Sequence, residues 1–156
     1  MYVVMVVALM VVLPIASMFI EVRFRQMPFS AAIALRWFVF WAVGVRLLTA
    51  GLSQIIRPHY TAEVILGLDL GEALFLVREL GFANTAVGLA AVVSVYVRPW
   101  SRPLALVGAV FYGLAGVNHS LHDERNPLQN IAMLSDLFVA IVLVVLLLLV
   151  VRQRNS

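Results

Sequence analysis

The sequence has no cysteine and no lysine, and it is poor in charged residues, glycine and proline. Without cysteine there are no disulfides, no thiolate nucleophiles and no cysteine-ligated metals. All 11 basic residues are arginine, and they are scattered between apolar segments, so nucleic acid is not an expected partner. Only 12% of the residues are charged, against about a quarter in soluble domains. With 9 Gly and 6 Pro, the chain also lacks the composition of a disordered or collagen-like protein.

What remains is a strongly apolar chain of 156 residues, 63% hydrophobic, with a mean hydropathy of +1.03. At about 20 residues per membrane-spanning helix, five spans and their loops account for the whole length. The sequence therefore predicts an all-α polytopic transmembrane helix bundle, a single domain over residues 1–156, with a four-helix core and an extra N-terminal span. The expected spans are about 2–20, 31–56, 79–97, 103–121 and 127–151.

The segment 57–76 is too polar to span a membrane and too apolar for a flexible loop, so we expect an interfacial or re-entrant helix there. The start of the last span has the clearest helix cap. Asn126 is suited to the N-cap position, Pro127 to the first helical position, and Gln129 can reach back to the cap. Small residues in the third and fourth spans predict close helix packing. These are Gly81, Gly88, Gly108, Gly113 and Gly116.

The short loops differ in charge on the two sides of the predicted membrane. With five spans, one side receives Arg23, Arg25, Arg98, Arg102, Arg152 and Arg154. The opposite side is net acidic. Because cytoplasmic loops carry an excess of basic residues, we expect the N-terminus outside and the C-terminus in the cytoplasm.

Two opposite charges lie at one predicted depth inside the membrane. Arg46 is near the middle of the second span, and Asp136 is about ten residues into the fifth. An isolated charge at mid-bilayer costs about 2.5 to 3.5 kcal/mol, which favours an intramembrane pair. An unpaired alternative stays open, in which Arg46 bonds helix carbonyls or extends toward the headgroups, while Asp136 is protonated or bonded by Ser135 or Asn130.

A second polar group gathers near the predicted outer face, at the start of the third span and the end of the fourth. This outer polar cluster comprises Glu79, Asn84, Asn118, His119, His122 and Asn130. On a helix His119 lies three residues from His122 and four from Asp123, so these side chains can converge. Together with Glu79 they form a candidate ligand set for Zn, Fe or Cu. A hydrogen-bonded helix end, or a proton or ligand site without metal, explains the same residues.

The polar residues also carry a family resemblance. The run Glu79-Leu80-Gly81-Phe82-Ala83-Asn84, followed by His119, Asn130 and Asp136, resembles a group of small uncharacterised bacterial membrane proteins, a domain of unknown function. The layout is also loosely similar to that of the small four-helix DoxX-like proteins. The resemblance covers about residues 30–150 and leaves the first span as an extra. It implies a bacterial cytoplasmic membrane and a connected set of polar residues, and it implies no substrate.

Three functions are compatible with these features, and none of them assigns a catalytic residue. The first is a non-catalytic accessory or scaffolding subunit of a larger membrane assembly, in contact with lipid and with other subunits or copies of itself, and without a cofactor. The second is a membrane-embedded redox enzyme subunit, linked to a metal or a quinone through His119 and Glu79. The third is a proton- or ion-coupled transporter or channel that uses Arg46 and Asp136.

Overall fold

The computed structural model describes residues 2–26, 28–67, 73–122 and 125–155. Within these ranges the chain is almost entirely helical and contains no strand. The helices are α1 (Tyr2–Val7), η1 (Ala8–Val12), α2 (Leu13–Arg25), α3 (Ala31–Phe38), η2 (Val39–Val45), α4 (Arg46–Ile56), η3 (Tyr60–Ile65), α5 (Ala73–Val93), η4 (Arg98–Trp100), α6 (Ser101–Ser120) and α7 (Pro127–Asn155). η1, η2 and η3 are π-helical, and η4 is a 3₁₀ turn.

Five helical stretches in the described part of the chain are long and apolar enough to cross a membrane. They are Val3–Arg25, Ala31–Ile56, Ala73–Val93, Arg98–Ser120 and Pro127–Gln153. The first two are each continuous through a π-helical segment. The predicted all-α bundle with five membrane-spanning helices is therefore confirmed.

Some helix boundaries differ from those expected. The first helix continues to Arg25, five residues beyond the predicted end of its span, and α5 covers Ala73–Val93 where 79–97 was expected. In both cases the expected boundary falls at or next to a charged residue. Arg25, Arg78 and Glu79 instead lie at exposed helical positions. Long charged side chains there can extend toward the headgroups, so the helix need not end.

The segment between the second and third spans is only partly regular. It contains the short π-helix η3, and its last four residues belong to α5. Residues 68–72 lie outside the described residues. His59, directly before η3, and Glu63 on η3 form an exposed pair with 2.9 Å between Nδ1 and Oε1. An interfacial or re-entrant placement of this segment stays a prediction.

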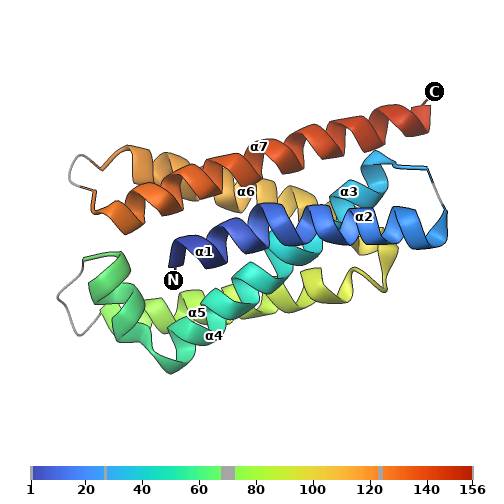
Figure 1. The fold of residues 1–156 in the computed structure, drawn as a ribbon. Helices are drawn as coiled ribbons and strands as arrows, with labels where there is room; N and C mark the ends of the chain where they lie inside the picture. Colours follow the sequence, from blue (N-terminus) through green and yellow to red (C-terminus); the bar gives the residue numbers. More distant parts are fainter. Residues whose placement is uncertain (1, 27, 68–72, 123–124, 156) are drawn as a thin grey trace.

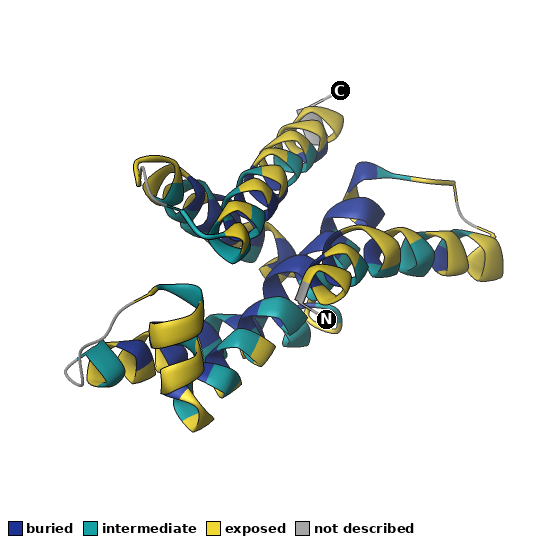
Figure 2. Cartoon of the chain, turned by 60° about the vertical axis from the view of Figure 1, so that its left-hand side comes forward, coloured by how far each residue is buried: buried dark blue, intermediate teal, exposed yellow. Residues whose placement is uncertain are grey.

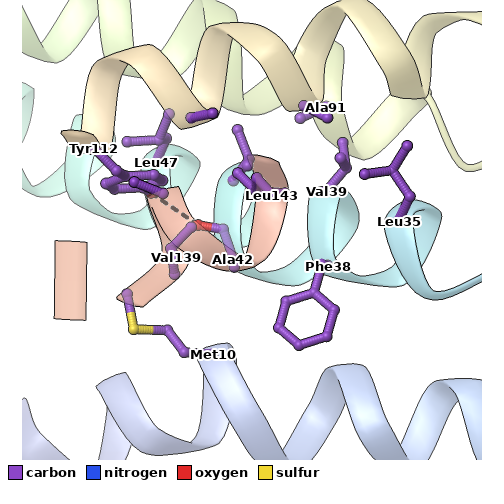
Figure 3. Close-up of a cluster of buried hydrophobic side chains, with 14 of the residues drawn as sticks. Met10, Leu35, Phe38, Val39, Ala42, Leu47, Ala91, Tyr112, Val139 and Leu143 are labelled. Atoms are coloured by element: carbon purple, nitrogen blue, oxygen red, sulfur yellow. Dashed lines mark hydrogen bonds between the residues drawn. The ribbon is translucent and has the colours of Figure 1, made fainter. Parts of the chain in front are cut away.

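The second span lies at the centre of the bundle. More than half of it is buried, against a third or less of each other span. Figure 2 shows the buried residues concentrated where the helices meet. The core around it takes Val39 and Val43 from the second span, Tyr112 from α6, and Val139 and Leu143 from α7. Met10 of the first span packs against the same core (Figure 3).

The hairpin of α4 and α5 depends on glycine at its interface. A Cβ atom added to Gly88 would lie 2.4 Å from the backbone nitrogen of Leu48. One added to Gly51 would lie 2.6 Å from the backbone nitrogen of Thr85. Such separations are shorter than any van der Waals contact, so the two backbones approach as closely as only glycine permits.

The predicted cap of α7 forms as expected. The amide of Gln129 donates to Oδ1 of Asn126, and the amide of Asn126 donates to Oε1 of Gln129, each at 2.9 Å. The same side chains also reach the end of η3. Nδ2 of Asn126 donates to the carbonyl of Ile65 at 3.4 Å, and Nε2 of Gln129 to that of Leu66 at 3.3 Å. This capping box therefore connects α7 to the segment before α5.

The glycine contacts give a direct test of the hairpin. We expect Gly88→Ala to lower the free energy of unfolding by about 1 to 3 kcal/mol, because the added methyl group overlaps backbone that cannot move away cheaply. Gly113→Ala is the matched control, since its Cβ would meet only the Cβ of Ala140 at 3.7 Å. Unfolding of both variants in mixed detergent micelles measures the difference. Equal stability of the two variants would contradict the close approach of α4 and α5.

Candidate functional site

Two buried charges in the middle of the bundle form an ion pair between two helices. Arg46 is the first residue of α4, directly after the π-helical η2, and Asp136 lies on α7. Nη2 of Arg46 donates to Oδ1 of Asp136 at 2.6 Å and to Oγ of Ser135 at 3.2 Å. The two charged side chains are 11% and 9% exposed. The structure thus brings together the two residues that the sequence placed at one depth.

An aromatic ring completes the surroundings of this pair. The guanidinium carbon of Arg46 lies 4.6 Å from the ring centroid of Tyr112, a cation–π contact. The hydroxyl of Tyr112 donates to the carbonyl of Ala42 at 2.8 Å (Figure 3). In η2 the amide of Arg46 donates to the carbonyls of Trp41 and Val43. The π-helical geometry therefore leaves the carbonyl of Ala42 to accept from a side chain of α6.

Sequence reasoning missed Tyr112, which is almost completely buried. A signal was present, because a tyrosine in the middle of an apolar span needs a partner for its hydroxyl group. Its partner is the backbone carbonyl of Ala42, and because every residue has such a carbonyl, the sequence does not indicate which one is the partner.

The outer polar cluster does not form one site. Asn84 is buried against the second span, where its Nδ2 donates to Oε1 of Gln54 at 2.8 Å. Glu79 and Asn118 are exposed. Asn84 thus belongs to the interface between α5 and α4.

The remaining members of that cluster surround the end of α6. Nη1 of Arg125 donates to the carbonyls of His119, at 3.2 Å, and of His122. Nε of the same arginine donates to Oδ1 of Asn130 at 2.9 Å, and Nδ1 of His122 lies 3.1 Å from the carbonyl of Asn118. Arg125 and His122 thus add side-chain hydrogen bonds to the carbonyls at the end of α6. Of the interpretations left open above, this arrangement fits the hydrogen-bonded helix end.

Three of the four candidate metal ligands, His119, His122 and Glu79, lie in the described part of the chain. Among the residues that the structure describes, no three histidine, aspartate or glutamate side chains lie close enough to hold one ion. This includes His119, His122 and Glu79, while Asp123 lies outside the described residues.

A second buried charge, Glu21, lies at the opposite end of the bundle from the end of α6. Its carboxylate accepts hydrogen bonds from Arg36 and, at 2.7 Å, from Nε1 of Trp37. Arg25 lies 3.6 Å away, one turn further along α2. Sequence reasoning missed this cluster because Glu21 falls between the expected spans 2–20 and 31–56. The available signal was a single acid at the end of an apolar run, next to several arginines.

Fold and site together define a multi-pass membrane protein made of a helical bundle with buried polar contacts between its spans. The chain belongs to a family of unknown function, DUF6790, whose match covers residues 1–156. The first span lies within that match, so it is not an addition to the family's shared region. No curated protein and no solved structure matches the chain.

The ion pair can be tested with a double-mutant cycle. We expect Asp136→Ala or Arg46→Met alone to lower the free energy of unfolding by about 2 to 4 kcal/mol, because each leaves an uncompensated buried charge. The double variant should lose much less than the sum of the two. Thr49→Ala is a control on the same helix, since that hydroxyl bonds only carbonyls of its own helix. Strictly additive losses would contradict a coupled pair.

Proposed function

We propose that this protein is a non-catalytic accessory or scaffolding subunit of a larger membrane assembly. The supporting observation is that its buried polar side chains form hydrogen bonds between spans of the same chain. Glu21, Asn84 and Asp136 each bond a side chain of another span of the same chain. In a bilayer, where apolar surfaces gain little from meeting each other, such bonds and close van der Waals packing hold helices together. These polar groups therefore build a rigid bundle.

The outer surface of α7 is the proposed contact with a partner. One side of this helix is buried in the bundle through Val139, Leu143 and Val150. The other side presents large aliphatic side chains, which are Ile141, Val144, Val145, Leu148, Leu149 and Val151. A continuous aliphatic surface of this kind suits packing against a helix of another subunit as well as contact with lipid.

We also propose an orientation in the bacterial cytoplasmic membrane, with the N-terminus outside and the C-terminus in the cytoplasm. In Figure 1 the end of α2, the start of α6 and the end of α7 lie at one end of the bundle. Arg25, Arg98, Arg102 and Arg152 belong to these segments or to the turn before α6. The excess of arginine at that end supports a cytoplasmic position.

Site-specific photo-crosslinking in the native membrane tests the accessory role. A photo-reactive residue at Leu148, which is 61% exposed, should give a discrete adduct with a second protein chain. The same residue at Leu143, which is fully buried on the same helix, should give none beyond the chain itself. Adducts with lipid alone at Leu148, and equally at Ile141 and Val145, would overturn the assignment of this face to a partner.

A second candidate function is proton- or ion-coupled transport through Arg46 and Asp136. It is favoured by η2, because π-helical turns occur frequently at functional sites and this one directly precedes Arg46. In that case Asp136→Asn, which keeps the side-chain shape, should abolish proton flux in proteoliposomes while the protein still folds. The scaffolding proposal expects no flux in the unsubstituted protein either, so one measurement separates the two functions.

A further inference from the structure

A cavity of about 270 Å³ opens at the arginine-rich end of the bundle. Its walls carry the side chains of Arg25, Arg36, Arg98 and Arg102 and a single carboxylate, that of Glu21. Four guanidinium groups against one carboxylate leave an excess of three positive charges. These residues come from α2, from α3, from η4 and from the first turn of α6, so the fold assembles the charge from distant parts of the sequence.

The positive charge is only partly used within the protein. Glu21 pairs with Arg36 and Arg25. Arg98 and Arg102 are exposed, and neither has an ion pair within the described ranges of the chain. Nε of Arg36 is buried and has no hydrogen-bond partner among those residues. Several donors at this cavity therefore remain for an anion.

Backbone dipoles add to the same field. The cavity is lined by Ser30 and Ala32 at the start of the second span, and by Ser101 at the start of α6. Ser30 is the N-cap of its helix, and its hydroxyl oxygen accepts from the amide of Ile33 at 3.3 Å. The N-terminus of a helix carries a partial positive charge. Two helix N-termini and four arginines therefore make the electrostatic potential in this one cavity positive.

An apolar groove of about 660 Å³ adjoins this cavity. The two share Glu21, Arg25, Arg36 and Arg98. Beyond these charged residues the groove is lined by aromatic side chains, which are Phe24, Trp37, Phe40, Trp41 and Tyr96. Phe24 and Tyr96 are 82% and 86% exposed, so the groove is open to the surroundings of the bundle. A charged cavity thus continues into an aromatic groove of the kind that a hydrocarbon chain can occupy.

We propose that this site binds a lipid with a phosphate monoester headgroup, the phosphate in the charged cavity and the hydrocarbon chain in the aromatic groove. Arginine forks bind phosphate oxygens in pairs, which suits the donors at the cavity wall. A monoester carries about −1.5 to −2 charges at pH 7, whereas a diester carries about one. The excess of three positive charges favours the monoester. Free phosphate would leave the aromatic groove empty.

Native mass spectrometry of the full chain in a non-ionic detergent tests this site. Dioleoyl phosphatidic acid should bind about tenfold more tightly than dioleoyl phosphatidylglycerol, which has the same chains and a diester headgroup. Arg98→Gln and Arg102→Gln should each weaken phosphatidic acid binding about tenfold by removing a charged donor. Neither side chain bonds another described residue, so the thermal unfolding midpoint should not change.

Arg23→Gln is the matched control, because Arg23 is also exposed, lies on α2 near the same end and lines neither cavity. It should leave binding of phosphatidic acid unchanged. Equal binding of the two lipids, or an equal loss of phosphatidic acid binding in the Arg23 variant, would overturn the proposal. Either result would mean that lipid binding reflects only general attraction between the arginines and anionic lipids. Displacement of phosphatidic acid by an equal concentration of inorganic phosphate would assign the site to a soluble anion instead. None of these outcomes depends on the accessory role.

Discussion

A charge pair in a medium of low dielectric constant holds the two halves of this molecule in place. α4 packs on α5 through glycine, and α6 packs on α7, so each pair forms a helical hairpin. Among the described residues, Arg46 and Asp136 form the only ion pair between these hairpins. Lipid offers neither group a comparable partner at that depth, so separating the hairpins would expose both charges to hydrocarbon. This ion pair therefore adds to the apolar core and to the Tyr112–Ala42 hydrogen bond that also join the two hairpins.

Depth in the membrane was readable from the sequence because an α-helix rises by a constant amount per residue. Counting from the ends of the apolar runs placed Arg46 and Asp136 at the same level, and the structure has them in contact. The cap from Asn126 to Gln129 was readable for a similar reason, since all of its contacts are local. The number of spans followed from apolar length alone.

The direction in which each side chain points was not readable in the same way. Asn84 and Glu79 lie five residues apart on one helix, yet Asn84 meets Gln54 in the interior while Glu79 is exposed. The number of residues between them does not predict which neighbouring helix, if any, each of the two side chains faces. Arg125, which holds the end of α6, comes from a loop with no periodic pattern at all. Spacing thus predicts which residues share a level, and tertiary packing decides which of them meet.

The π-helical segment before Arg46 sets the register of the second span. A π turn accommodates an extra residue compared with an α turn, and each residue of an α-helix advances the side-chain direction by about 100°. If Val39–Val45 were regular α-helix with the same number of residues, Arg46 would be rotated by roughly that angle relative to the residues before η2. The span would keep its hydrophobic length, but its arginine would turn away from α7. The π-helical segment therefore fixes the direction of one side chain, a constraint separate from the hydrophobic length that the bilayer requires.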